Sequence, residues 1–218
     1  MTRYTVARLD QIEEIDDGRC LFRPVRQHFG ITTFGITAWT ARAAGDRLLN
    51  EHQEAEPEPD SSEELYVVMS GHARFELDGE SQDAPAGTCV HAPMGVKRTA
   101  FALDAGTTVL AIGGGREGQP YRPSGWELFA PLFPLFASGD YEDGADRAEA
   151  ILADNPWLGA GSYYNTACFE SRAGRVDQAL ANLRRAVELS PSMAELARAD
   201  EDLETLREND AFMEITGD

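Results

Sequence analysis

Cysteine and positive charge are both scarce in this sequence. Three cysteines, Cys20, Cys89 and Cys168, stand far apart among 218 residues, and none belongs to a Cys-x-x-Cys pair. This excludes a cysteine zinc site and a disulfide framework, and it is typical of a reducing compartment. Lysine and arginine total 19 against 38 acidic residues, so the formal net charge is −19. Such a surface repels a phosphate backbone and an anionic membrane, which argues against a nucleic-acid or membrane-surface binder.

Long apolar runs and nucleotide-binding motifs are missing as well. The start, MTRYTVARLDQIEEIDD, is too polar for a signal peptide, and no apolar run approaches the length of a membrane span, so we expect a cytoplasmic protein. Residues 113–118 spell a formal G-x-G-x-x-G, but Pro120 and Pro123 follow where the dinucleotide motif needs a helix. We interpret this stretch as a linker, and nothing in the chain resembles a P-loop or a nucleophile elbow.

The two halves of the chain differ in composition and periodicity. Residues 5–115 are rich in Val, Thr, Phe and Gly with short runs of period two, whereas the chain from Ser124 onward is rich in Ala, Leu, Glu and Arg at helical spacing. The Gly- and Pro-rich stretch between them marks a boundary. We therefore predict a two-domain protein of a β + α class: a β domain over residues 1–118, a linker over 119–125 and a helical domain over 126–218.

The β half consists of short strands divided by turn signals. Residues 65–69 and 72–77 form the best predicted hairpin, with Ser70-Gly71 as its turn, and Asp78-Gly79 leads into the next strand. Many short strands separated in this way predict a sandwich or barrel. The other strand signals cover 30–49, 87–92 and 107–112, and the acidic, Pro- and Ser-rich middle of residues 51–64 is expected to be a loop.

The helical half contains two copies of a helix pair. Aligning Gly174 with Gly139 superimposes the copies with a period of about 35 residues. The glycines turn the chain between the two helices of each pair, and small residues such as Gly144 and Ala179 let those helices approach closely. Pro134 lies inside the first helical pattern and is expected to interrupt it.

The second helix pair resembles a tetratricopeptide repeat, and the first resembles a degenerate copy of it. The resemblance covers about residues 126–191 and implies a concave groove for a peptide or protein partner. The matching positions that would face this groove are Tyr164, Cys168, Ser171 and Arg172. The alternative is that two repeats are too few for a groove, so that the domain packs on the barrel or on a second subunit.

Two stretches of the β half resemble the two motifs of the cupin family. Glu64 is followed by glycine after six residues, as in the first motif, and Gly87, Pro93 and Gly95 have the spacing of the second. The resemblance covers about residues 30–113 and implies a double-stranded β-helix, or jelly-roll barrel. A barrel of this kind with a repeat tail also resembles a group of bacterial cupin–tetratricopeptide (TPR) proteins of unassigned function.

Arg98 stands where the second cupin motif has its histidine. The family's metal sites combine histidines with one glutamate, which suits Fe, Mn, Ni or Zn, whereas a guanidinium cannot ligate a cation. We therefore expect Arg98 to pair with Glu64 inside a metal-free barrel. Such a cavity would suit a small anionic molecule such as a carboxylate, with Tyr66, Val68 and Trp39 as lining residues.

The alternative interpretation keeps a divalent metal in the barrel. His52, Glu54 and Glu64 could hold Fe, Mn, Ni or Zn, and His91 would add a ligand if its strand turned that face inward. The protein would then be a metal-dependent enzyme of dioxygenase or isomerase type that uses His52 and Glu64. We favour a small-molecule- or partner-binding protein without catalytic machinery or cofactor. Because cupin barrels often pair through their sheets, we expect a homodimer.

Overall fold

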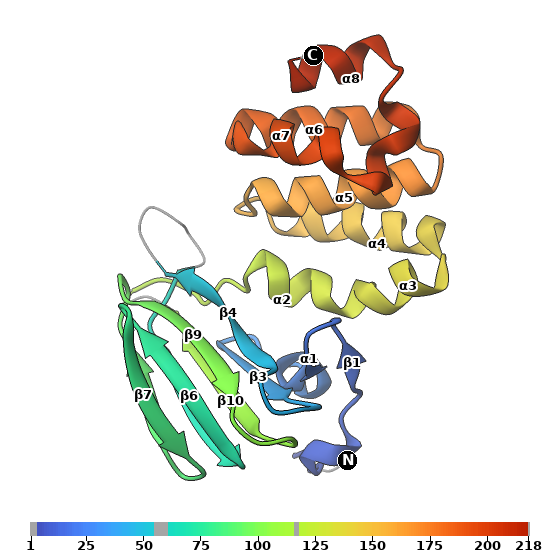
Figure 1. The fold of residues 1–218 in the computed structure, drawn as a ribbon. Helices are drawn as coiled ribbons and strands as arrows, with labels where there is room; N and C mark the ends of the chain where they lie inside the picture. The colour runs from blue at the N-terminus through green and yellow to red at the C-terminus, as the bar shows by residue number, and fades with distance from the viewer. Residues whose placement is uncertain (1–3, 55–60, 116–117, 218) are drawn as a thin grey trace. The chain divides into compact units, whose positions relative to one another are not determined.

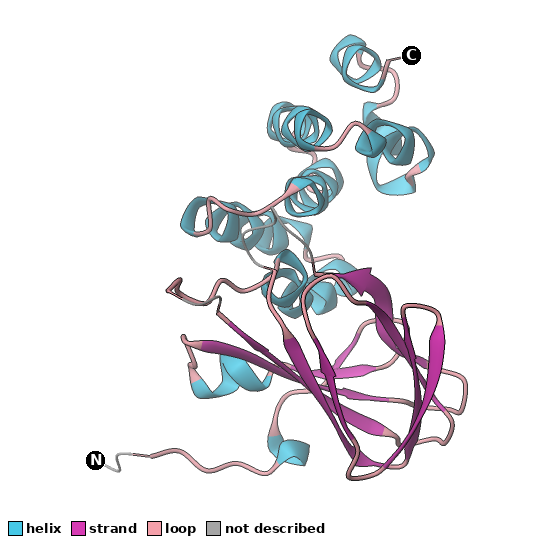
Figure 2. Cartoon of the chain, turned by 90° about the vertical axis from the view of Figure 1, so that its left-hand side faces the viewer, coloured by secondary structure: helices cyan, strands magenta, loops and turns pink. Residues whose placement is uncertain are grey.

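Two antiparallel sheets face each other in the N-terminal unit (Figures 1 and 2). The computed structural model describes residues 4–54, 61–115 and 118–217, and the chain divides into the units Met1–Pro123 and Ser124–Asp218. The larger sheet has the order β1 (Ile15–Asp16), β2 (Leu21–Arg23), β3 (Phe34–Thr40), β10 (Thr108–Gly114), β5 (Glu64–Ser70) and β8 (Cys89–Ala92). The smaller sheet has the order β4 (Arg47–Gln53), β9 (Lys97–Ala102), β6 (His72–Leu77) and β7 (Glu80–Pro85).

Ser70-Gly71 carries the chain from one sheet to the other. β5 belongs to the larger sheet and β6 to the smaller one, so the hairpin predicted between them is wrong, although both strands form where expected. Gly71 has a φ of 71°, and a Cβ there would lie 2.7 Å from the Cα of Thr107, so the corner needs glycine. The Asp78-Gly79 hairpin is confirmed, because both residues have positive φ and β6 pairs with β7.

The strand signal over residues 30–49 divides into β3 and β4. The turn between them is held by Asp46, whose carboxylate accepts hydrogen bonds from the backbone N–H groups of Arg42 and Ala43 at 2.8 and 2.9 Å. β4 then continues to Gln53, into the region predicted as a loop, because its residues pair with β9. Residues 55–60 of that predicted loop lie outside the described part of the chain.

The N-terminal segment covers the outer face of the larger sheet. This segment includes the 3₁₀ turn η1 (Leu9–Gln11) and the short helix α1 (Val25–Phe29). Ile12, Val25 and Ala38 form a buried cluster there, so β3 is packed on its outer face as well as toward the sandwich interior. The inner face of the sheet is therefore the one that remains for a site between the two sheets.

The C-terminal unit is a series of antiparallel helices (Figure 1). Its elements are α2 (Gly125–Phe129), η2 (Ala130–Leu132), α3 (Phe133–Ser138), α4 (Tyr141–Asp154), α5 (Ala160–Arg172), α6 (Val176–Leu189), α7 (Ser192–Ala199), η3 (Glu201–Leu206) and α8 (Asp210–Thr216). A β half followed by a helical half is thus confirmed in this coarse form. The helices of the described residues are too short or too polar to cross a membrane.

Prolines and glycines set the helix boundaries as predicted. The interruption expected at Pro134 is confirmed, since residues 125–138 form three short pieces, α2, η2 and α3. Gly139 and Gly174 have φ of 83° and 77° and end α3 and α5, which confirms the two turns. Gly144 of α4 lets that helix approach Phe169 of α5, because a Cβ at Gly144 would lie 2.3 Å from the aromatic ring.

Candidate functional site

His52 reaches the interior because β4 contains an irregularity. Leu49 pairs with Ala100 of β9 and His52 pairs with Arg98, so three steps along β4 match two steps along β9. This bulge shifts by one residue the alternation of side chains between the two faces of β4. In a regular strand Glu51 would point inward, but here His52 does. His52 therefore lies beside Arg98 on the inner face of the smaller sheet, opposite β5.

Arg98 and Glu64 meet between the two sheets. Arg98 Nη2 and Nε donate to Glu64 Oε2 at 2.8 and 3.2 Å, and the hydroxyl of Tyr66 donates to the same oxygen. Arg98 Nη1 donates to the carbonyl oxygen of Val96 at 2.8 Å. Arg98 has no exposed surface, whereas 19% of the Glu64 side chain is exposed. The structure thus brings together the pair expected from the sequence.

Glu64 stays charged despite its burial. Burial raises the pKa of this carboxyl, but hydrogen bonds from His52 and Tyr66 and the charge of Arg98 outweigh it, so the pKa lies below its usual value. Burial and the charge of Glu64 raise the pKa of Tyr66 well above its usual value. The phenol of Tyr66 therefore keeps its proton and remains a hydrogen-bond donor to the carboxylate.

Both ring nitrogens of His52 face acceptors. Nδ1 lies 2.8 Å from the carbonyl oxygen of Asn50, and Nε2 lies 3.3 Å from Glu64 Oε2. Because a carbonyl and a carboxylate only accept hydrogen bonds, this geometry favours the imidazolium with a proton on each nitrogen. Burial opposes that charge, but the hydrogen bonds to Glu64 and Asn50 outweigh it and raise the pKa of His52. With 35% of its side chain exposed, His52 is within reach of a ligand.

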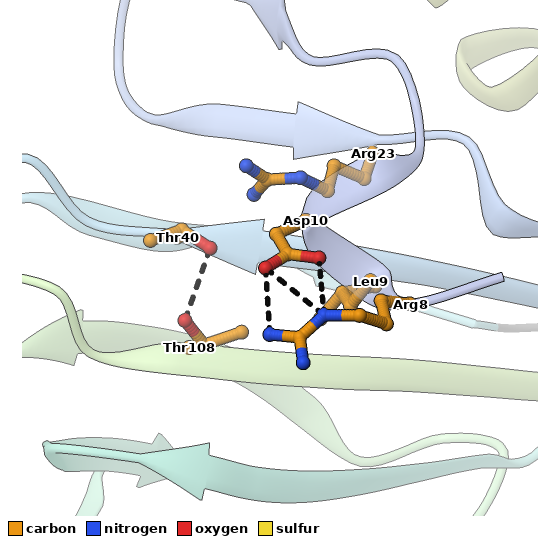
Figure 3. Close-up of a pocket in the computed structure, with 6 residues that line it drawn as sticks. All are labelled: Arg8, Leu9, Asp10, Arg23, Thr40 and Thr108. Atoms are coloured by element: carbon orange, nitrogen blue, oxygen red, sulfur yellow. Dashed lines mark hydrogen bonds and ion pairs between the residues drawn. The ribbon is translucent and has the colours of Figure 1, made fainter.

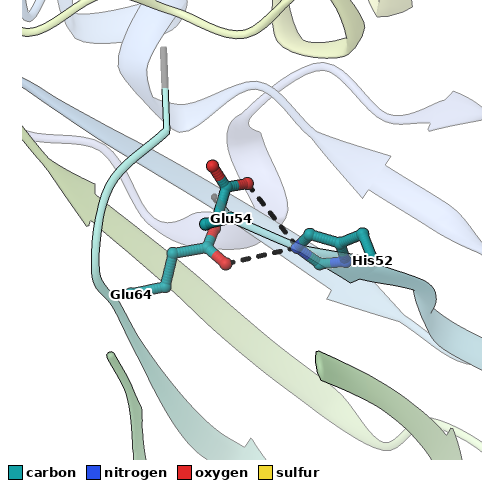
Figure 4. A group of neighbouring side chains, drawn as sticks. All are labelled: His52, Glu54 and Glu64. Carbon is teal, nitrogen blue, oxygen red and sulfur yellow. Dashed lines mark hydrogen bonds and ion pairs between the residues drawn. The ribbon is translucent and has the colours of Figure 1, made fainter. Parts of the chain in front are cut away.

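Glu54 completes the His52–Glu54–Glu64 group (Figure 4). Glu54 Oε1 lies 3.8 Å from His52 Nε2, and one ligand atom from each of the three side chains lies within 4.8 Å of the others. Burial and the charge of Glu64 raise the pKa of Glu54. The N–H of Ser62 donates to Glu54 Oε2 at 3.3 Å, and the side chain of Ser61 also bonds Glu54. The sequence did not indicate either serine, because both precede β5 in a stretch without periodicity.

The guanidinium of Arg98 counts against a divalent metal ion at the His52–Glu54–Glu64 group. A metal ligand needs a neutral imidazole with a free lone pair and a carboxylate oxygen open to the cation. Here His52 Nε2 faces Glu64 Oε2 at 3.3 Å, and that oxygen already accepts from the fixed cation of Arg98. The fixed positive charge of Arg98 repels a cation bound at the same carboxylate, which lowers the affinity for a metal.

The predicted lining residues share the inner face with Glu64 but lie progressively farther from that carboxylate. They are Tyr66, Val68 and Trp39. Tyr66 and Val68 alternate with Glu64 along β5, and Trp39 lies in the row of Val68, because both pair with Val109. Trp39 is 7% exposed and packs on Phe22, with ring centroids 5.0 Å apart. Val68 and Trp39 therefore fill the interior at a distance from the His52–Glu54–Glu64 group.

The prediction of His91 as a metal ligand is wrong. His91 of β8 pairs with Leu65 of β5, the neighbour of Glu64 that points to the opposite face of the sheet. The histidine is exposed on that outer face, and its Nε2 lies 2.9 Å from Glu63 Oε2. Its strand does not turn this face inward, so His91 and the His52–Glu54–Glu64 group lie on opposite sides of the larger sheet.

The chain itself covers the predicted groove of the helical unit. Tyr164 donates to Asp200 Oδ2 at 2.8 Å, and Ser171 Oγ lies 3.2 Å from Thr205 Oγ1. Tyr164, Cys168 and Ser171 are consequently buried, and only Arg172 keeps an exposed side chain. The expectation that these four residues line an open groove is wrong, because residues 200–206 pack on that face of α5.

Cys168, Asp200 and Asp202 form a second cluster of metal-ligand types, within 4.8 Å of one another. The hydroxyl of Tyr164 and the guanidinium of Arg172, which donates to Asp202 Oδ1 at 3.0 Å, already engage the two carboxylates. Burial raises the pKa of the Cys168 thiol, so the sulfur keeps its proton. The cluster is therefore a structural contact between α5 and the segment that covers it.

An open depression of about 440 Å³ lies on the outer face of the larger sheet (Figure 3). Its floor is formed by Thr40 and Thr108, whose hydroxyl oxygens lie 3.0 Å apart, and its wall by Arg8 and Asp10. Arg8 Nη2 and Nε donate to Asp10 at 2.8 and 3.0 Å, and Arg23 at the edge pairs with Glu14. Each arginine of the depression is thus paired with a carboxylate of the same chain. The depression therefore offers no unpaired charge to a ligand.

Comparisons with known proteins give a fold likeness only. No family model and no curated protein matches the chain. Among solved structures, an RmlC-like cupin protein from Desulfovibrio desulfuricans is 24% identical, with a TM-score of 0.41 over 51% of this chain and 97% of that one. A cupin-superfamily sugar phosphate isomerase from Silicibacter pomeroyi is 17% identical, with a TM-score of 0.43 over 51% of this chain and 76% of that one.

The nucleoside dehydratase Pac13 from Streptomyces is similar to about the same extent. It is 16% identical, with a TM-score of 0.39 over 53% of this chain and 85% of that one. The chain is therefore similar to solved cupin structures over about half of its length. The strand order of the two sheets, rather than these likenesses, defines the fold of the N-terminal unit.

Proposed function

We propose that the N-terminal unit binds a small polar molecule at the His52–Glu54–Glu64 group and uses no metal ion there. One observation carries the proposal: the fully buried guanidinium of Arg98 donates to Glu64 Oε2, the carboxylate oxygen that also faces His52. A cation that is part of the chain thus already bonds the oxygen of Glu64 that faces His52, which supports a site without a metal.

The accessible groups of the site define what it can bind. All three nitrogens of Arg98 donate to oxygens of the protein, so an anionic ligand would contact the imidazolium of His52 instead. Glu54 and Glu64, with 22% and 19% of their side chains exposed, would accept hydrogen bonds from hydroxyl or amide groups. The combination suits a ligand that carries both an acceptor for His52 and a donor for a carboxylate.

Metal analysis tests this proposal directly. The untagged chain, incubated with Fe²⁺, Mn²⁺, Ni²⁺ or Zn²⁺ and then gel-filtered, is expected to retain much less than one metal ion per chain. The His52→Ala variant serves as the comparison and should give the same low content. Stoichiometric metal in the wild-type chain that is lost in a folded His52→Ala variant would overturn the proposal.

That outcome would support a second candidate function, a metal-dependent enzyme of dioxygenase or isomerase type. The observation in its favour is the closeness of three ligand types, with His52, Glu54 and Glu64 offering atoms within 4.8 Å of one another. The two candidates differ in the state of Glu64 Oε2, which accepts from Arg98 in the first and would bind the metal in the second. Metal content therefore separates them without a known substrate.

For the helical unit we propose contact with a protein partner through a face other than that of α5. Residues 200–206 cover the α5 face, so a peptide would have to displace Leu203 and Leu206, neither of which has exposed surface. We retain a homodimer as the expected assembly. Light scattering at micromolar concentration should give twice the mass of the chain, and a monomer would contradict this part of the proposal.

A further inference from the structure

One row of side chains crosses the four strands of the smaller sheet, which lie side by side in Figure 1. Arg47 of β4 pairs with Phe101 of β9, which pairs with Arg74 of β6. Arg74 in turn pairs with Asp83 of β7. Residues directly opposite in an antiparallel sheet point to the same face. Ala100, the neighbour of Phe101 along β9, is buried, so the row lies on the outer face of the sheet.

The two arginines of this row hold their guanidinium groups over the ring of Phe101. The guanidinium carbon lies 5.6 Å from the ring centroid in Arg47 and 5.4 Å in Arg74. Within the described part of the chain, no carboxylate pairs with Arg47. Arg74 pairs with Glu76 at 3.6 Å, an exposed contact of little strength. In a chain with a net charge of −19, the row therefore offers positive charge to a second molecule.

Asp83 supplies the opposite charge at the other end of the row. His72 Nε2 lies 2.6 Å from Asp83 Oδ1, and 72% of the Asp83 side chain is exposed. A carboxylate accepts hydrogen bonds at both oxygens, so Asp83 can keep its contact with His72 and still accept from an external guanidinium. β4 and β7 are the two edges of the sheet, three strand spacings of about 4.8 Å apart. Arg47 and Asp83 therefore do not meet within one chain.

We propose that this outer face is the interface between two copies of the chain, related by a two-fold axis parallel to the strands and between β9 and β6. Such an axis places β4 of one copy on β7 of the other, and β9 on β6. The row then meets itself in reverse order. Arg47 lies opposite Asp83 of the second copy, Phe101 lies opposite Arg74 of the second copy, and each contact occurs twice. This inference rests on the homodimer of the proposed function and assigns a face to it.

Charge complementarity favours a second copy over an acidic protein of another kind. The row contains both signs of charge, in an order that complements itself when it is reversed. An acidic partner that bonded Arg47 and Arg74 would bring further negative charge close to Asp83, and like charges in an interface are unfavourable. Two sheets that pack with nearly parallel strands, about 10 Å apart, also let the ring of Phe101 and the arginine stems interdigitate.

Light scattering of two charge-reversal variants, Arg47→Glu and Asp83→Arg, tests the face. Each variant places like charges opposite each other twice per dimer. We expect the Kd of the dimer to rise about tenfold or more in both, with the fold intact by circular dichroism. Asp83→Arg lowers the net negative charge of the chain, so overall repulsion cannot explain a weaker dimer. Arg184→Glu, at an exposed arginine of α6, is the matched control and should leave the Kd unchanged.

An equimolar mixture of the two variants tests the pairing across the axis. In a mixed dimer the substituted positions 47 and 83 carry opposite charges and face each other, while the native Asp83 and Arg47 face each other in the second contact. We therefore expect the mixture to form dimers about tenfold or more tightly than either variant by itself. Because the two positions lie on opposite edges of one sheet, such a rescue requires contact between copies.

The outcomes separate the assigned face from the homodimer itself. Unchanged dimers of the folded variants, or a mixture that associates no better than the variants separately, would overturn the face and leave the homodimer in place. A monomeric wild-type chain would overturn both. The His52–Glu54–Glu64 group does not enter these measurements, and its proposed function is tested separately by metal analysis.

Discussion

Arg98 Nη2 donates to Glu64 Oε2 across 2.8 Å, from a side chain with no exposed surface. The substitution Arg98→Met keeps most of the side-chain volume but leaves the Glu64 carboxylate without its guanidinium partner. We expect the free energy of unfolding to fall by about 3 kcal/mol, the low end for breaking a buried ion pair, because His52 still donates to Glu64. Urea unfolding followed by circular dichroism measures the change.

Two comparisons control for this effect. The double change Arg98→Met with Glu64→Gln removes the unpaired charge and should recover part of the loss. Arg8→Met removes an arginine whose side chain is 77% exposed and should change the stability little. If Arg98→Met were no more costly than Arg8→Met, the pair would not be the stabilising contact that the geometry indicates.

Arg98→His tests the link between this position and metal binding. The change removes the fixed cation and supplies an imidazole beside His52, with which position 98 pairs across β4 and β9. We expect the variant to gain about one Ni²⁺ or Zn²⁺ per chain, bound with His52 and Glu64, as measured by elemental analysis after gel filtration. Arg98→Met is the control and should stay metal-free. A folded Arg98→His variant without metal would show that more than the guanidinium opposes binding.

Glu170 is expected to make the helical unit sensitive to pH near neutrality. Burial raises the pKa of its carboxyl, and although Asn182 donates to both oxygens at 2.9 Å, the neighbouring Glu149 raises it further, to about 7. This folded-state value exceeds the ordinary value of 4.5. The stabilisation is therefore fully present below pH 4.5 and is lost as the pH rises through 7.

Glu170→Gln should remove this dependence. We expect the wild-type midpoint of thermal unfolding to fall by several degrees between pH 5 and pH 8, which corresponds to about 1–2 kcal/mol after allowance for solvent screening. The variant should lose less over the same range and exceed the wild type at pH 8. Parallel curves for the two proteins would show that Glu170 does not titrate in this window.

Gly144→Ala is expected to destabilise the helical unit despite the better helix propensity of alanine. The added Cβ would lie 2.3 Å from Phe169, whose ring is 4% exposed and held between α4 and α5. We expect a net loss of about 1–2 kcal/mol, because overpacking outweighs a propensity gain of at most about 1 kcal/mol. Gly161→Ala on α5 meets nothing within 4 Å and should be neutral or slightly stabilising. Thermal unfolding of both variants decides this, and equal stability would argue against the close contact.

Alternation and motif spacing predict the inner face of β5 well. Tyr66 and Val68 point inward with Glu64, because a strand with one buried face repeats every two residues. The cupin-like spacing also predicts the meeting of Glu64 with Arg98, more than thirty residues later in the chain, which the structure contains. Both predictions concern regular strands, in which the local sequence determines the face to which each side chain points.

Contacts between segments far apart in the chain could not be predicted from the sequence. Tyr164 has the spacing of a groove residue, yet the fold of residues 200–206 over α5 buries it, and no local pattern marks that contact. The place of Tyr121 follows from the missing side chain of Gly35, which belongs to a different part of the chain. A glycine inside a predicted strand is the one signal that could have indicated a close approach there.

The irregular pairing of β4 with β9 decides which side chain of β4 faces Glu64. In the bulged alignment the imidazole of His52 faces Glu64, whereas strict alternation from Leu49 would bring the carboxylate of Glu51 there instead. Two adjacent carboxylates would repel, whereas His52 bonds with Glu64, so this contact favours the bulged form. The side chain that a ligand would meet thus also contributes to the register of the strand.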